Sequence, residues 1–157
     1  MENEMEQSTV FLNGTDVFYQ YAKAKGELKG TMVLIHGFVS SCYCFRKIIP
    51  KLRKHYNIYA LDLPGFGRSG KRKDFEYSFH NYANVIISFC RLFELQKVIL
   101  VGHSMGGQVA LYTALNQPDL VEKLILMSSS GYLKTCETFP YLCIVSPICK
   151  IGYEVLV

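Results

Sequence analysis

Four largely apolar runs recur along the chain. Three of them end at polar or turn-forming residues: "GTMVLIHG" (30–37), "YNIYALDLPG" (56–65) and "KVILVG" (97–102). A fourth, "LVEKLILMSSS" (120–130), carries two charges near its start and ends in serines. Runs of this length and composition are typical of strands that are buried on both faces, as in a parallel sheet.

Between these runs, apolar or small residues recur at helical spacing. The three stripes consist of Phe45, Ile48, Ile49 and Leu52; Tyr82, Ile86, Phe89 and Phe93; and Gly106, Ala110 and Ala114. Pro50 interrupts the first stripe, where we expect a break or a kink. Strands that alternate with such stripes predict βαβ units and a doubly wound α/β sheet.

The first part of the chain follows a different pattern. In "STVFLNGTDVFYQYA" (8–22), Asn13-Gly14 separates two segments rich in β-forming residues, which predicts a hairpin. The sequence therefore predicts an N-terminal β-hairpin followed by a mostly parallel sheet of about six strands in all.

Polar or glycine-rich segments follow all four apolar runs: "HGF", "DLPGFGRS", "GHSMGG" and "SSSG". The carboxyl ends of parallel strands meet at one edge of the sheet, and ligands of such folds bind there. We therefore expect the four segments to lie together and to form the functional site.

The segment "VGHSMGG" (101–107) places Ser104 where a strand gives way to a helix. A strand, G-x-S-x-G and a helix in this order resemble the nucleophile elbow of the α/β-hydrolase fold. The preceding "HGF" and "DLPGFGRSG" match that family in order and spacing, from about residue 9 to residue 130. The resemblance is nearest to its esterase, lipase and C–C hydrolase branch, whose members carry a cap domain.

The resemblance implies a role for each residue of this motif. Ser104 would be the catalytic nucleophile, and Gly102 and Gly106 would give the tight turn the space it requires. The backbone N–H groups of Phe38 and Met105 would form the oxyanion hole. Serine at the elbow argues against dehalogenases and epoxide hydrolases of this fold, which are expected to carry aspartate there. The expected substrate is a small acyl compound, such as an ester, and no metal or organic cofactor is implied.

A serine nucleophile needs a base, and the four histidines of the chain are poor candidates. They are His36, His55, His80 and His103. His36 resembles the family's loop histidine, which shapes the oxyanion loop. His103 should point away from the nucleophile toward neighbouring strands. We expect His55 at a basic helix end and His80 at the surface or at the cap of a helix.

Neither of the two aspartates near the predicted strand ends suits the acid of a triad. Asp62 lies in "DLPGFGRS", which looks like the family's structural turn, and Asp119 should lie at the opposite end of the sheet. In the family order the acid and the histidine follow the nucleophile. No histidine follows Ser104 here, so we expect both groups on residues beyond this chain.

This absence leaves two hypotheses. The chain is the N-terminal part of a serine hydrolase, or it is a non-catalytic truncated fragment or binding module. We assign residues 1–131 to the N-terminal part of the core domain and residues 132–157 to the start of an incomplete cap. The last strand would then be an open edge, and its expected partner is a missing C-terminal half or a second copy of the chain.

The composition indicates a single globular domain and argues against several kinds of binding partner, but it does not indicate a function. Half of the 157 residues are apolar or aromatic, which suits one domain with a sizeable core. The net charge is only +4, and its basic segments, 45–56 and 67–73, are best read as solvated surface, so no nucleic-acid partner is expected. The six cysteines show no zinc spacing. The acidic N-terminus resembles no export signal. We therefore expect a cytoplasmic protein with reduced thiols and no membrane anchor.

Overall fold

The four apolar runs form four parallel strands of one sheet. The computed structural model describes residues 5–130. Its strands β3 (Thr31–Ile35), β4 (Asn57–Leu61), β5 (Val98–His103) and β6 (Val121–Met127) lie in the order β4-β3-β5-β6. All three pairings among them are parallel, so their carboxyl ends meet at one edge of the sheet. The predicted doubly wound arrangement is confirmed.

The predicted hairpin extends this sheet beyond β4. Strands β1 (Glu6–Leu12) and β2 (Thr15–Ala22) pair antiparallel, and β2 pairs antiparallel with β4, which completes the order β1-β2-β4-β3-β5-β6. Asn13 and Gly14 both have positive φ, 50° and 81°. Two positive φ angles are the signature of the type I′ turn, whose twist matches that of the two strands.

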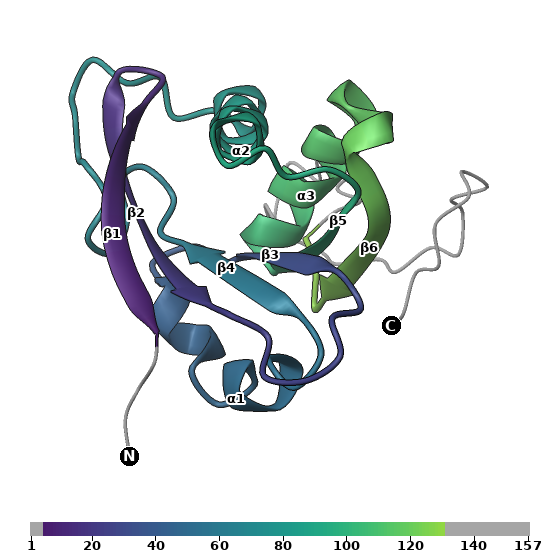
Figure 1. The fold of residues 1–157 in the computed structure, drawn as a ribbon. Coiled ribbons are helices and arrows are strands. Elements are labelled where there is room, and N and C mark those ends of the chain that lie inside the picture. Colours follow the sequence, from purple (N-terminus) through teal and green to yellow (C-terminus); the bar gives the residue numbers. More distant parts are fainter. Residues whose placement is uncertain (1–4, 131–157) are drawn as a thin grey trace.

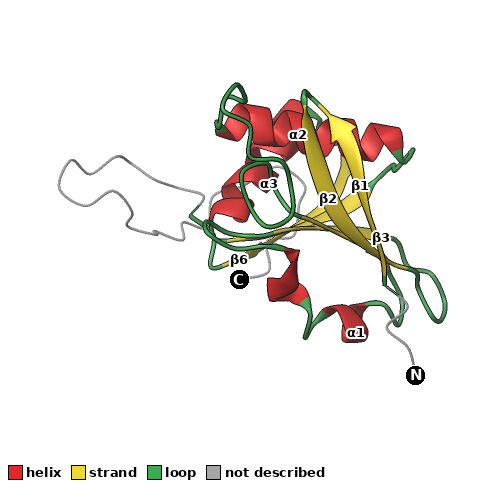
Figure 2. Cartoon of the chain, turned by 90° about the vertical axis from the view of Figure 1, so that its left-hand side faces the viewer, coloured by secondary structure: helices red, strands yellow, loops and turns green. Residues whose placement is uncertain are grey.

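Helices cover both faces of the sheet, as Figures 1 and 2 show. Helices α2 (Phe79–Leu92) and α3 (Met105–Asn116) pack on one face. The short elements η1 (Cys42–Phe45) and α1 (Ile49–Leu52) pack on the other, and η2 (Pro118–Leu120) leads into β6. Pro50 does not break a helix, because it lies in the first turn of α1, where its missing N–H costs no hydrogen bond.

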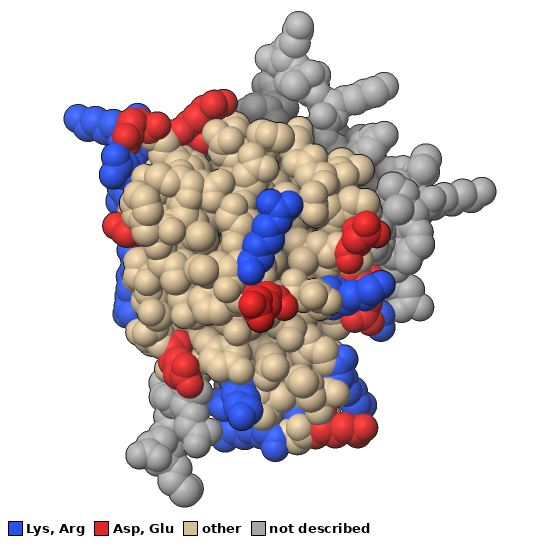
Figure 3. Space-filling model, turned by 45° about the horizontal axis from the view of Figure 1, so that its top comes forward, with Lys and Arg blue, Asp and Glu red and all other residues tan. Residues whose placement is uncertain are grey.

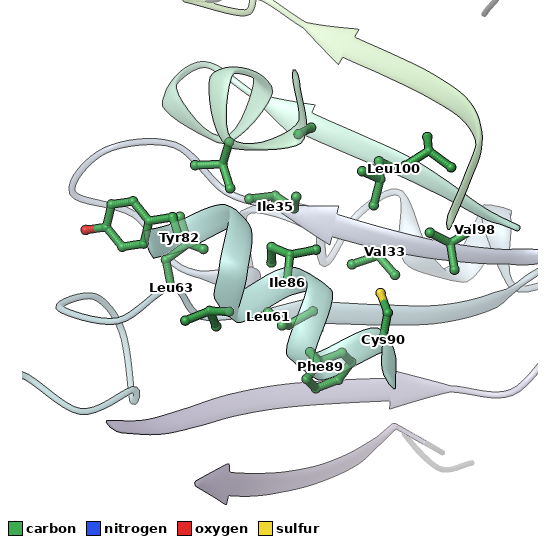
Figure 4. Packing of buried hydrophobic residues seen from close by; sticks show 14 of the residues in the cluster. Val33, Ile35, Leu61, Leu63, Tyr82, Ile86, Phe89, Cys90, Val98 and Leu100 are labelled. Carbon is green, nitrogen blue, oxygen red and sulfur yellow. The ribbon is translucent and has the colours of Figure 1, made fainter. Parts of the chain in front are cut away.

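Two hydrophobic clusters reflect the alternation of side chains along the strands. The larger cluster lies between the sheet and α2 and α3, and Figure 4 shows Ile86 and Phe89 of α2 directed at Val33 and Leu61. The smaller cluster packs Leu34 of β3 against η1 and α1 on the other face of the sheet. Phe89 is fully buried, and truncation of such a side chain to alanine costs about 3–5 kcal/mol.

Helix α2 is capped by a residue that the sequence reasoning did not single out. The Ser78 side chain accepts a hydrogen bond from the N–H of Asn81, 3.2 Å away. Serine is among the preferred N-cap residues because its oxygen satisfies an N–H that lacks a partner within the helix. His80 is the second residue of the helix and is exposed, so its expected surface location is confirmed, and the cap is Ser78.

Strand β6 is an edge of the sheet within residues 5–130. Its outer N–H and C=O groups are therefore available to another strand. Self-association through this edge stays a prediction. The assignment of residues 132–157 to a cap lies outside the described residues.

Candidate active site

Ser104 lies at the sharp turn between β5 and α3. Its φ is 52° and its ψ is −120°, and a positive φ at this residue is what the tight turn of a nucleophile elbow requires. A non-glycine residue in this region is strained and keeps the conformation only when its surroundings enforce it. Ser104 is also half-buried rather than sealed in the core.

The two glycines that flank Ser104 are required by contacts with the backbone. A Cβ on Gly102 would overlap the carbonyl oxygen of Gly106 and come within 2.5 Å of the Cα of Gly107. A Cβ on Gly106 would overlap the carbonyl oxygen of Ile35 and approach that of His36. Any side chain at these positions would therefore push α3 away from β3 and β5 and open the turn.

Residues at the end of β6 hold the turn from the other side. The N–H of Ser104 donates to the carbonyl of Met127, 3.0 Å away. The carbonyl of Ser104 accepts hydrogen bonds from the N–H and the hydroxyl of Ser130, each at 3.2 Å, and from the N–H of Gly107 at 2.9 Å. Sequence reasoning placed the serines at this edge but gave no sign that Ser130 would bind the nucleophile's own backbone.

The loop after β3 lies directly against the nucleophile. A Cβ on Gly37 would come within 3.0 Å of the Cβ of Ser104, so Phe38 follows immediately beside it. Met105 is the first residue of α3, and its N–H has no acceptor within the helix. The convergence of the Phe38 and Met105 N–H groups on one small space stays a prediction.

His36 ties the ends of β3 and β4 together and is unsuited to act as a base. Its Nε2 accepts a hydrogen bond from the N–H of Leu63 at 2.9 Å, so the proton is on Nδ1, which donates to the carbonyl of Gly37 at 2.7 Å. Burial lowers the pKa of His36 and keeps the ring neutral. Both ring nitrogens are occupied, so the interpretation of His36 as a loop-shaping residue is supported.

The other three histidines do not reach the Ser104 hydroxyl within the part of the chain that the structure describes. His103 directs its buried Nδ1 toward Gly37 at the end of the neighbouring strand. His55 lies just before β4, at the opposite end of the sheet from Ser104. His80 borders a hollow with Asn116 at the far end of α3, roughly 18 Å along a twelve-residue helix.

Asp62 is a structural residue, as its sequence context indicated. It is 1% exposed, and its two carboxylate oxygens accept hydrogen bonds from the N–H of Cys42 at 2.6 Å and of Arg68 at 2.8 Å. The carboxylate therefore connects the start of η1, at Cys42, to the turn that follows β4, at Arg68. Asp119 lies in η2 before β6, away from the elbow, as expected.

Two arginines of the basic segment 67–73 interact with neighbouring side chains. The Arg68 guanidinium donates to Gln7 at 2.7 Å and lies over the ring of Phe18, and Arg72 forms an exposed ion pair with Asp74. On the face in Figure 3, acidic side chains are interspersed with the basic ones. This distribution fits the interpretation of these segments as solvated surface.

Residues 5–130 contain neither a metal-binding cluster nor a membrane-spanning helix. Within this range no group of three or more histidine, cysteine, aspartate or glutamate residues is arranged to hold a metal ion. None of the helices in the same range has the length and apolar character needed to cross a bilayer. Cys42, Cys44 and Cys90 are free thiols.

Comparison with known proteins identifies the family. A family model described as alpha/beta hydrolase fold matches residues 30–142. The chain belongs to the α/β-hydrolase fold family. Among its relatives is a Bacillus subtilis protein named as an uncharacterized hydrolase, YugF, which is 46% identical over 123 residues. A pimeloyl-[acyl-carrier protein] methyl ester esterase from Pectobacterium carotovorum is 31% identical over 121 residues and is matched by 76% of this chain.

Solved structures of the same family superpose on this one. The epoxide hydrolase CorEH without ligand has a TM-score of 0.76 and 30% sequence identity, with 83% of this chain covered. The aligned region makes up 44% of the length of CorEH, 44% of YugF and 45% of the methyl ester esterase. In the alignment with YugF it covers 78% of this chain. The chain thus corresponds to the N-terminal part of the relatives, somewhat less than half of their length.

Proposed function

We propose that Ser104 is the nucleophile of an ester hydrolase of the α/β-hydrolase fold family. The observation that carries the proposal is the strained backbone of Ser104, whose φ of 52° is enforced by Gly102 and Gly106 and by hydrogen bonds from the end of β6. A serine that only capped a helix would need none of this strain, because N-cap residues adopt ordinary extended angles.

The reaction would proceed by acyl transfer to Ser104. A base takes the hydroxyl proton as Oγ attacks the ester carbonyl, and the resulting oxyanion accepts hydrogen bonds from the N–H groups of Phe38 and Met105. The C–O bond to the alcohol then breaks, and the alcohol leaves with the proton from the base. Water, activated by the same base, hydrolyses the acyl-enzyme and releases Ser104.

The base of this scheme is none of the four histidines described above. The proposal therefore assigns the base and its acid to the part of the family fold that follows residue 130. The relatives named above include an ester hydrolase and an epoxide hydrolase. Serine at the elbow favours ester cleavage, since epoxide opening in this fold is expected to use an aspartate.

The test compares the 157-residue chain with a fusion in which its core is joined to the C-terminal part of YugF. We expect the fusion to hydrolyse short p-nitrophenyl esters and to react at Ser104 with a fluorophosphonate. The chain alone should do both far more slowly. In a well-studied serine protease, loss of the histidine lowers turnover by about 10⁶.

Two matched variants of the fusion decide the role of Ser104. Ser104→Ala should abolish both activity and labelling, whereas Ser128→Ala, which changes an exposed serine at the same edge of the sheet, should leave both intact. Activity that survives Ser104→Ala would contradict the proposal. An inactive but folded fusion that does not label would favour the alternative, a binding module without catalysis.

A further inference from the structure

Two large apolar side chains stand out at the edge of the sheet beside Ser104. Phe38 is 71% exposed and Val39 is 77% exposed, although both belong to the loop that touches the nucleophile through Gly37. Exposed apolar residues that occur singly need no explanation, but two adjacent ones at a candidate active site indicate a surface that binds something apolar.

The backbone of Val39 strengthens this interpretation. Its φ is 49°, in the left-handed region that glycine adopts freely and that β-branched residues adopt only as outliers. Burial among residues 5–130 does not offset this cost, because the valine side chain is exposed there. Strain without compensation within the fold is most often found where a residue serves a ligand.

Phe38 is held in place rather than free to turn into solvent. Its ring meets the ring of Phe66 edge to face, at 5.7 Å between centroids and 76° between planes. Phe66 meets His36 in the same way, at 5.6 Å and 80°. The hydrogen-bonded His36 thus fixes a row of rings that ends at Phe38, and edge-to-face contacts of this kind are specific in geometry.

The charged side chains of the neighbouring loop are engaged away from this surface. Asp62 is buried with both oxygens occupied, and Arg68 reaches Gln7 and Phe18 on the hairpin. The Lys71 ammonium donates to the carbonyls of Gly67 and Ser69. A ligand on Phe38 and Val39 would therefore meet an apolar surface, which suits a hydrocarbon chain better than an anionic or cationic group.

We propose that the side chains of Phe38 and Val39 form an apolar wall that binds the acyl chain of the substrate. This inference rests on the proposed function, since Ser104 would hold the carbonyl from which the chain extends. It selects esters with an apolar acyl chain of several carbons over acetyl esters. Val39 contributes directly through its isopropyl group.

The test measures how fast two p-nitrophenyl phosphonates, one with a hexyl and one with a methyl group on phosphorus, label Ser104 of the fusion with the C-terminal part of YugF. Intact-mass spectrometry gives both rates, and their ratio cancels the reactivity of the serine itself. Val39→Thr keeps the shape and the β-branch but replaces a methyl by a hydroxyl. We expect it to lower the hexyl-to-methyl ratio about fourfold, the effect of one buried methylene.

Two further variants separate binding from stability. Val39→Gly removes the side chain and the strain together, so it should lower the ratio further while raising the melting temperature. Tyr43→Ser removes an exposed aromatic residue of η1 and should leave the ratio unchanged. A hexyl-to-methyl ratio that is the same in the unchanged fusion, in Val39→Thr and in Val39→Gly would contradict the proposed apolar wall.

A second measurement does not depend on the reactivity of Ser104. Diethyl hexylphosphonate, which cannot label serine, should shift the ¹³C-methyl NMR signals of Val39 saturably, whereas diethyl methylphosphonate should not. Absence of a shift would overturn the inference even if Ser104 proves to be the nucleophile. A saturable shift in a protein whose Ser104 fails the labelling test would support the wall and contradict the proposed function alone.

Discussion

Replacing Ser104 by glycine should make the protein more stable while removing its proposed nucleophile. Ser104 is held at a φ of 52° and a ψ of −120°, where the Cβ of any L-residue collides with its own backbone. Glycine has no Cβ and relieves this strain. Alanine keeps the Cβ, so Ser104→Ala retains the strain and is the matched control, although it removes the same hydroxyl.

The size of the effect follows from two opposing contributions. Strain at such a position costs about 1–3 kcal/mol in the folded state. Glycine loses more conformational entropy on folding, which offsets about 0.5–1 kcal/mol of the gain. We therefore expect the free energy of unfolding of the Ser104→Gly variant to be about 0.5–2 kcal/mol higher than that of the Ser104→Ala variant. For a chain of this size, that difference corresponds to roughly 2–6 °C in melting temperature.

Urea unfolding followed by far-UV circular dichroism measures this difference, and calorimetry checks the melting temperature. Equal slopes of free energy against urea in the two variants would show that the unfolded states are comparable. If the glycine variant is no more stable than the alanine variant, the backbone at Ser104 is not strained. The physical argument for a nucleophile elbow would then lose its main support.

Three other predictions concern the surroundings of the elbow. Asp62→Ala leaves one buried and one partly buried N–H donor without an acceptor and should cost about 2–4 kcal/mol in the free energy of unfolding measured with urea. Asp62→Asn should cost roughly half as much, and a loss under about 1 kcal/mol for Asp62→Ala would contradict the anchoring role. Burial lowers the pKa of His36, so the stability it contributes is complete above about pH 6.5 and is lost as the pH falls toward its folded-state pKa. His36→Asn should flatten that part of the plot of unfolding free energy against pH, and an unchanged slope would refute the assignment. Burial raises the pKa of Cys90 to about 12 and also raises the pKa values of Cys42 and, in part, Cys44. Cys44 is the exposed thiol of the three, so iodoacetamide at pH 8 should alkylate it at least about tenfold faster than Cys42 or Cys90, as peptide mass spectrometry can establish.

The sequence specified the strands and the elbow because both depend on local patterns. Apolar runs that end in glycine or polar residues mark β3, β4 and β5, and Asn13-Gly14 has few conformations other than the hairpin turn. Gly102 and Gly106 could be assigned their roles in advance, because the space around a tight turn is a property of the neighbouring residues. The first helical stripe was less informative, since η1 and α1 divide it between them.

What the sequence could not reveal are contacts between segments that are distant along the chain. The bond between Asp62 and the N–H of Cys42, and the bonds from Ser130 to Ser104, join different loops of the sheet edge. Nothing in the residues around Val39 signals its positive φ, because valine there is chemically ordinary and only the path of the loop imposes the angle. Such features become visible once the loops are placed side by side.

The clamp on Ser104 by Met127 and Ser130 also bears on the order in which the protein folds. Strand β3 in the middle of the sheet pairs with β4 and β5, which lie far from it in sequence, and contacts of this kind slow folding. The strained turn gains its last hydrogen bonds only when β6 docks beside β5. During synthesis on the ribosome, the turn would therefore remain unformed until the segment through Ser130 has emerged, and Ser104 would not reach its strained conformation before that moment.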